Sequence, residues 1–317
     1  MRTKLYMIAL AAISMMLGSC SDTNSEFSQD FLADTPIKLN VSVDEPTTRA
    51  GYSDADKPTG FVLDVNNNKA EKYNYLVWAK KVGDSWKTYK PDETLKGGTD
   101  EEVTMLWANM NDKVDVTAFT NIGTITIPTD QTSDDQLKEA DVLYMPFTKY
   151  TPTNKGITVN LQHAMSKINL TIELGSEFEF TEDINKKITD VKIDGSSVSG
   201  DLASGGIYDV SGDPTPITPL YTGETAFSKE AGKITKATAT YEAILIPQTI
   251  ESGKFTVSFK VDGKLYEWAY NQELTLAPTT AYTLKLTAGD DKVQPVSFSV
   301  APWGVGNGEN GEKKETD

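Results

Sequence analysis

The sequence predicts a mostly β protein made of two antiparallel β-sandwich domains. Short runs of β-branched and aromatic residues recur along the chain, and Gly, Pro, Asn and Asp separate them, which is typical of sandwiches. Helical periodicity is sparse. A chain of 317 residues is also longer than one hydrophobic core usually supports, so we expect two domains.

The first predicted strand has the clearest pattern. Ile37, Leu39, Val41 and Val43 alternate with polar residues, which is the period of a strand with one buried face. Later apolar runs predict further strands at 61–65, 73–82, 103–108, 114–120, 122–127, 156–162, 168–174, 188–193, 239–246, 255–261, 265–270, 282–286 and 296–300.

Two segments allow a more detailed prediction. Apolar residues alternate over 255–261, Asp262 and Gly263 tolerate the positive φ of a tight turn, and 265–270 returns, which predicts a β-hairpin. The segment 133–140 predicts one short helix, which Ser133 or Asp134 caps.

The N-terminal residues predict export and lipid attachment. Basic residues precede an apolar run at 5–17, and the small residues Gly18 and Ser19 lead to Cys20, an order that matches a bacterial lipobox. We expect a signal peptide over 1–19, cleavage between Ser19 and Cys20, acyl chains such as palmitate on Cys20, and a tether over 20–35. The alternative is an ordinary signal peptide with an incidental cysteine.

Charge and cysteine content exclude several classes of partner. The net charge is −16, and removal of 1–19 takes away two basic residues and no acids, which leaves the mature chain near −18. Such a surface repels nucleic acid and anionic lipid. Cys20 is the only cysteine, and lipidation would leave no thiol for catalysis or metal binding.

Few residues favour catalysis. His163 is the only histidine, and it lies where the apolar phase of the neighbouring residues changes, so we expect it to be packed or hydrogen-bonded at an irregularity. The segment 64–71 weakly resembles a calcium loop but lacks its sixth-position Gly, so we expect an Asn-rich turn, with calcium as the alternative. Scattered carboxylates leave a glycosidase as a third candidate. We predict no enzymatic activity, no cofactor and no metal.

The tryptophans raise the alternative of glycan binding. Trp78 and Trp107 lie within apolar runs, and we expect them in the core. Trp86 lies between polar neighbours near a turn, so it is the candidate for an exposed aromatic patch that binds sugars. The alternative function is thus a monomeric surface lipoprotein that binds glycans.

The expected domains are 36–175 and 176–303, with a boundary in the segment that follows the predicted strand at 168–174. Polar, Gly-rich residues at 304–317 predict a flexible tail.

An arginine follows the first predicted strand. Pro46 limits the strand ladder, so Arg49 is expected in an accessible linker that suits a trypsin-like protease. Cleavage between Arg49 and Ala50 would release the lipidated segment together with the first strand. The groove left behind would accept a strand of another chain by β-augmentation. The alternative is an ordinary surface arginine after an edge strand.

The order of four segments resembles the fimbrillin family, the subunits of type V pili of Gram-negative anaerobes. These segments are the lipobox, the strand that ends near Arg49, the sequence Leu-Gln-His-Ala-Met-Ser-Lys-Ile at 161–168, and the late segment 274–284 that leads to Val-Ala-Pro-Trp at 300–303. The resemblance implies two transthyretin-like sandwiches, cell-surface or outer-membrane localisation, and a role in adhesion. It implies cleavage at Arg49 and removal of the strand with Ile37, Leu39, Val41 and Val43.

Assembly by strand exchange also needs a donor strand. Val296, Phe298 and Val300 alternate suitably, but beyond Trp303 only Val305 is a sizeable apolar residue. Either 296–303 is itself the donor strand, or the chain is a tip, accessory or anchoring subunit, and we favour the second. Its expected partners are other fimbrial subunits, the outer membrane through the lipid, and proteins or glycans of host or bacterial surfaces.

Overall fold

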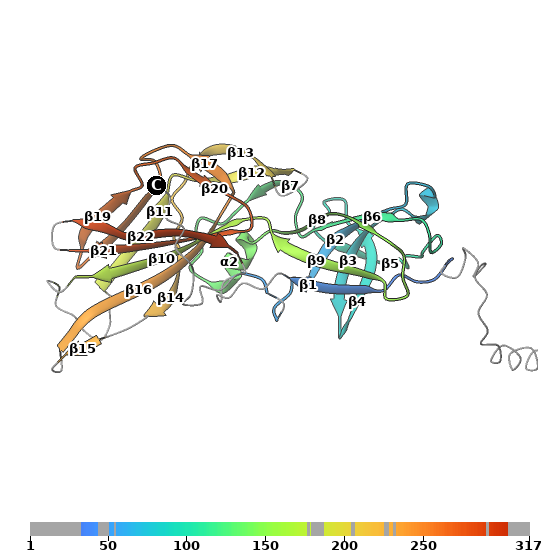
Figure 1. Cartoon of the computed structure of the whole chain (residues 1–317), viewed down its shortest axis with the longest axis horizontal. Coiled ribbons are helices and arrows are strands. Elements are labelled where there is room, and N and C mark those ends of the chain that lie inside the picture. Colours follow the sequence, from blue (N-terminus) through green and yellow to red (C-terminus); the bar gives the residue numbers. More distant parts are fainter. Residues whose placement is uncertain are drawn as a thin grey trace, which may run out of the picture.

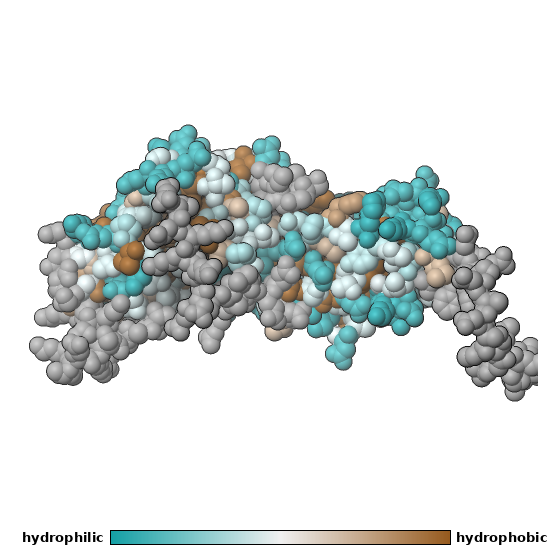
Figure 2. Space-filling model, in the orientation of Figure 1, coloured by the Kyte–Doolittle hydropathy of each residue, from teal (hydrophilic) through white to brown (hydrophobic). Residues whose placement is uncertain are grey.

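The fold is mostly β, as the sequence predicts, and the molecule is elongated with two β-rich parts (Figure 1). The computed structural model describes residues 33–43, 51–53, 55–175, 178, 187–203, 207–224, 228–230, 233–289 and 292–303. The face seen in Figure 2 is largely hydrophilic, with apolar side chains scattered over both parts, in keeping with the acidic composition.

One eight-stranded sheet forms the first part. Its strands in spatial order are β1 (Leu39–Val43), β9 (Ile157–His163), β8 (Leu143–Tyr150), β6 (Val114–Phe119), β2 (Gly60–Asn66), β3 (Tyr75–Val82), β4 (Ser85–Pro91) and β5 (Gly98–Glu102). A 3-10 helix, η1 (Glu71–Tyr73), lies between β2 and β3. The sheet curls until β1 lies against β4, and it encloses a cluster of buried side chains that includes Phe61 and Trp107. We call this cluster the first core.

Several smaller sheets form the second part. The largest contains β14 (Leu220–Glu224), β16 (Lys233–Leu245), β10 (Ser166–Leu174), β21 (Thr280–Ala288) and β22 (Val293–Pro302), with β15 (Ser228–Glu230) paired to β16. The others are β11 (Ile188–Asp194) with β18 (Thr256–Val261) and β19 (Lys264–Ala269); β13 (Ile207–Pro214) with β12 (Ser197–Ala203) and β7 (Gly123–Thr126); and β17 (Gln248–Ile250) with β20 (Leu274–Leu276). Their buried side chains form the second core, which includes Ile168 and Phe259.

The two detailed local predictions are confirmed. β18 and β19 form the expected hairpin, and Asp262 and Gly263 take φ values of 49° and 84° in its turn. The helix α2 (Asp134–Ala140) begins at Ser133, whose side chain accepts from the backbone N–H of Gln136 in a capping box.

The sheets are mixed, whereas the sequence predicts antiparallel sheets. β1 runs parallel to β9, and β10 runs parallel to β21. Parallel neighbours need long crossover connections, and more than a hundred residues separate the strands of each pair. Apolar residues alternate in the same way in parallel and antiparallel strands, so the sequence does not reveal that these two pairs are parallel.

The two cores divide the chain differently from the predicted boundary near residue 175. Ile168 and Leu174, at either end of the predicted strand 168–174, lie in the second core because β10 pairs with β16 and β21. Side chains of β7 and α2 also pack there. Within the described residues the chain passes between the cores three times, between Ala118 and Ile125, between Val142 and Leu143, and between Leu161 and Ala164. The division into two domains stays a prediction.

Candidate functional site

The strand β1 is an edge strand whose apolar side chains belong to the first core. It pairs with β9 alone, in register from Leu39 opposite Ile157 to Val43 opposite Leu161. Val41 and Val43 are 9% and 3% exposed. The strand therefore completes the core at one end of the described sheet.

The residues before β1 extend this attachment. Ile37 lies ahead of the strand, and its backbone N–H donates to the carbonyl of Met105 at 2.9 Å. The backbone N–H of Asp34 donates to the carbonyl of Trp107 at 2.9 Å, and Trp107 donates back to Thr35 at 3.0 Å. The N-terminal attachment thus spans 34–43 and two partners, β9 and the segment 105–107, whereas the sequence predicted only the alternating strand.

A buried cluster lies where the chain passes between the two cores. The His163 ring stacks on the indole of Trp303, with centroids 4.0 Å apart and planes 4° apart. His163 Nδ1 lies 2.9 Å from Oδ1 of Asp141, and both side chains are almost fully buried. We call His163, Asp141 and Trp303 the junction cluster. The predicted packed and hydrogen-bonded role of His163 is confirmed.

The segment that follows Arg49 in the sequence is attached to this cluster. The backbone N–H of Tyr52 donates to Oδ2 of Asp141 at 2.8 Å. Gly51 is buried at φ +92°, and a Cβ there would lie 2.6 Å from the same oxygen. Only glycine fits this close approach. Burial, and then the negative charge of Asp141, raise the pKa of the Tyr52 hydroxyl.

A buried ion pair borders the junction cluster. Nζ of Lys167 lies 3.1 Å from Oε2 of Glu242, and the side chains are 1% and 10% exposed. The ammonium also lies 5.9 Å from the centre of the Trp303 ring, within cation–π range. Burial lowers the pKa of Lys167, and Glu242 opposes this effect.

The strand β22 is the other edge strand of interest. Among the described strands it pairs only with β21, from Val293 opposite Ala288 to Pro302 opposite Thr280. Val296 and Val300 are 55% and 58% exposed. The ring of Phe298 packs against Tyr270 and Tyr282, with centroids 5.1 and 6.1 Å away. β22 is therefore a C-terminal edge strand whose alternating apolar face is only partly covered.

Comparison with known families shows which family the chain belongs to. A family model described as fimbrillin-like matches residues 48–303. The chain belongs to the fimbrillin-like family. No curated protein is similar enough in sequence to match this fimbrillin-like chain.

Two solved structures of Bacteroides proteins share the fold. A crystal structure of a candidate cell adhesion protein from Bacteroides ovatus has a TM-score of 0.57 and 16% identity, over 86% of this chain and 98% of that one. A similar protein from Bacteroides uniformis gives 0.54 and 15%, over 85% and 98%. The tip fimbrial protein Mfa3 from Porphyromonas gingivalis gives 0.46 and 10%, over 78% and 95%.

Membership of the fimbrillin-like family supports a fimbrial role at the cell surface. It implies assembly with other fimbrial subunits and points to a structural protein. It bears on neither lipidation nor the mode of assembly.

Several predicted site residues lie outside the described residues, namely Ser19, Cys20, Arg49 and Ala50. None of the helices in the described part of the chain has the length and apolar character needed to span a bilayer. Of the other predicted residues, Leu39, Val41 and Val43 lie on β1, and Val296, Phe298 and Val300 lie on β22.

The structure corrects two predictions about tryptophans. Trp107 is buried in the first core as expected, but Trp78 is only half-buried because Val77 and Ala79 take the inward positions of β3. Trp86 packs on the first core, with its ring centroid 5.2 Å from that of Phe61. The predicted aromatic patch at Trp86 is therefore wrong.

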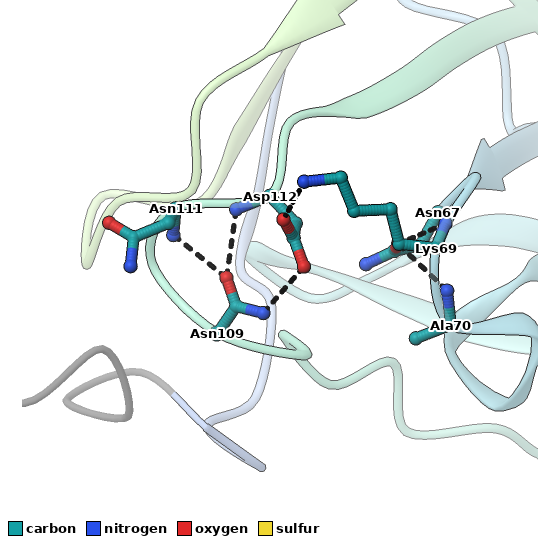
Figure 3. Close-up of polar contacts among 6 residues, drawn as sticks. All are labelled: Asn67, Lys69, Ala70, Asn109, Asn111 and Asp112. Carbon is teal, nitrogen blue, oxygen red and sulfur yellow. Dashed lines mark hydrogen bonds and ion pairs between the residues drawn. The ribbon is translucent and has the colours of Figure 1, made fainter.

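Polar side chains of 64–71 tie two loops together (Figure 3). Oδ1 of Asn67 accepts from the backbone N–H groups of Lys69 and Ala70, which forms the expected Asn-rich turn. The ammonium of Lys69 reaches Oδ1 of Asp112 at 2.6 Å, and Asn109 holds the other oxygen of that carboxylate at 2.8 Å. In the part of the chain that the structure describes, His, Cys, Asp and Glu side chains form no group of three that could hold a metal ion.

Proposed function

We propose that the chain is a structural subunit of a fimbria, exported as a lipoprotein through Cys20 and assembled by β-strand exchange after cleavage at Arg49. The observation that carries the proposal is the seating of β1. An edge strand supplies core residues to the first core, and it lies just upstream of the proposed cleavage site.

Removal of β1 would leave a groove with a strong preference for an apolar strand. Burial of Val41 and Val43 stabilises the protein by roughly 3–6 kcal/mol together. That energy keeps β1 in place before cleavage. After its departure the unpaired edge of β9 and the vacated pockets favour a replacement strand with the same alternation.

The arginine content sharpens the case for cleavage. Arg2 and Arg49 are the only arginines in the sequence, so an arginine-specific protease has one site after the predicted signal peptide. Every other cation-forming side chain in the mature chain is a lysine or His163.

The attachment of Gly51 and Tyr52 supports a cut at this place. Their contacts with Asp141 lie on the far side of Arg49 from β1. The new N-terminus would therefore stay docked at the junction cluster while the lipidated segment leaves.

The exposed face of β22 suits two roles. We favour a tip, accessory or anchoring role, and the alternative is that β22 is donated to the next subunit. Val296 and Val300 provide the alternation that the groove beside β9 would accept. Donation would require Phe298 to leave its contacts with Tyr270 and Tyr282.

An arginine-specific digest of the exported full chain tests the proposal. We expect a single cut after Arg49, loss of the segment that contains β1, and oligomers that resist SDS. An Arg49→Lys variant is the matched control, since it keeps the charge and removes the site. Mass spectrometry of the natural N-terminus distinguishes lipidated Cys20 from free Ala50. A cut chain that keeps β1 and stays monomeric would contradict strand exchange.

A further inference from the structure

A pocket of about 360 Å³ opens on the outer face of the first sheet, between β3, β4 and the start of β5. Two aromatic side chains line it, and four polar ones surround them: Trp78, Tyr89, Thr59, Lys80, Thr99 and Asp100. Its size is within the range of about 300–1,000 Å³ that is usual for small-molecule sites.

Strand alternation explains why the aromatic residues face outward together. Val77 and Ala79 are buried in the first core, so Trp78 and Lys80 point to the opposite face of β3. Trp78 pairs directly with Tyr89 on β4. Cross-strand partners share a face, so the two rings are neighbours in the pocket.

Two glycines make room for the indole. A Cβ at Gly98 would lie 2.6 Å from Cδ1 of Trp78, and a Cβ at Gly60 would lie 2.5 Å from Cζ2 of the same ring. Any larger residue at either position would displace the ring or the strand. The indole is thus held between two strands that lack side chains at the points of closest approach, and its position is fixed by the fold.

The polar groups of the pocket include both donors and acceptors. The Lys80 ammonium donates, the Asp100 carboxylate accepts, and the Thr59 hydroxyl can do both. The Thr99 hydroxyl already donates to the carbonyl of Lys90 at 3.2 Å. Lys80, Asp100 and both threonines are exposed. A sugar ring matches this combination, because its C–H face packs on an aromatic ring while its hydroxyls each donate and accept.

Competing ligand classes fit less well. A quaternary ammonium would be repelled by Lys80, and it prefers a cage of aromatic rings. An anionic ligand would meet Asp100, its acidic neighbours Glu101 and Glu102, and a net charge of −16. The lining therefore favours a neutral carbohydrate.

We propose that the Trp78–Tyr89 pocket binds a short stretch of neutral oligosaccharide. This function goes beyond the assembly role and does not depend on it, because the pocket lies on the outer face of β3 and β4, apart from β22 and the junction cluster. The sequence suggested a glycan site at Trp86, and we instead propose one at Trp78 and Tyr89 on the outer face of the sheet.

Binding of the full chain to an array of neutral oligosaccharides of glucose, galactose, mannose and N-acetylglucosamine tests the proposal, with sialylated and sulfated glycans alongside. Saturation-transfer NMR then measures affinity for the strongest binder. We expect Asp100→Asn and Trp78→Phe each to weaken binding about tenfold or more. Asp84→Asn, in the β3–β4 turn of the same sheet, is the control and should bind as the parent chain does.

Three outcomes would overturn the proposal: no neutral glycan binds, binding survives both substitutions, or only acidic glycans bind. Trp78→Phe could weaken packing of the sheet, so its melting temperature is measured first. Asp100 is exposed and its substitution should leave the fold intact, which keeps the test decisive. Failure here would leave cleavage and oligomer formation untouched.

Discussion

The contact between Gly51 and Asp141 can be tested by a single methyl group. In Gly51→Ala the new Cβ would lie 2.6 Å from Oδ2 of Asp141, closer than non-bonded atoms approach, in a residue whose φ is +92°. Either Asp141 must move away from its partners or the segment 51–52 must leave the junction cluster. In both cases the hydrogen bond from Tyr52 is lost.

Two effects set the magnitude. A side chain in the left-handed region costs roughly 1–2 kcal/mol, and loss of a hydrogen bond to a charged group costs roughly 1.5–3 kcal/mol. Gly51→Ala should therefore lower the free energy of unfolding by about 2.5–5 kcal/mol. Gly263 has a φ of +84° and open space around it, so Gly263→Ala should show the first effect alone.

Urea denaturation followed by tryptophan fluorescence gives both free energies. His163 is the only histidine, so its ring resonances report on the junction cluster without assignment of the rest of the chain. We expect Gly51→Ala to shift them and Gly263→Ala to leave them in place. If the two variants lose equal stability and the His163 signals do not move, the attachment of 51–52 to Asp141 is wrong.

Three further predictions concern the cores and the loops. Glu242→Ala removes the carboxylate that lies 3.1 Å from the buried Lys167 ammonium and should lower the free energy of unfolding in urea by about 3–5 kcal/mol. Adding Lys167→Met should recover much of this loss. Val43→Ala removes buried methyl groups from β1, so the free energy of unfolding should fall by about 2 kcal/mol. In a chain cut at Arg49, β1 should also dissociate faster. The hydrogen bond from Lys69 lowers the pKa of Asp112 in the folded protein. The ion pair therefore stabilises the fold at pH values above the ordinary pKa of an aspartate, and this stabilisation is lost as the pH falls through the lowered pKa of Asp112. Lys69→Met should raise that pKa toward its ordinary value in an NMR titration, and no change would contradict the ion pair.

Local patterns in the sequence were sufficient for the elements that depend on near neighbours. The alternation of β1, the hairpin of β18 and β19, and the Ser133 cap of α2 each follow from side chains a few residues apart. The change of apolar phase beside His163 likewise marked the end of β9 and the start of β10.

Long-range contacts could not be predicted in this way. Asp141 and Trp303 are 22 and 140 positions from His163, and no local pattern marks either as its partner. The Trp78 prediction failed for a different reason. Apolar residues run almost continuously through β3, so their period does not say which face is inward. Only the pairing with β2 and β4 decides this.

The N-terminal segment is held at two places by different forces, and Arg49 lies between them in the sequence. Residues 34–43 are held by backbone pairing and by apolar burial in the first core. Residues 51–52 are held by a charged hydrogen bond at the junction cluster. In the uncut chain the two attachments reinforce each other, because the covalent link between them keeps a detached strand close to its groove. In a chain cut at Arg49 that effect would be lost for β1 alone, so its departure would depend on its own burial energy and on the concentration of competing strands. A cut beyond Tyr52 would instead release the docked residues together with β1, whereas Arg49, the only arginine after the predicted signal peptide, lies between the two attachments and suits the proposed processing.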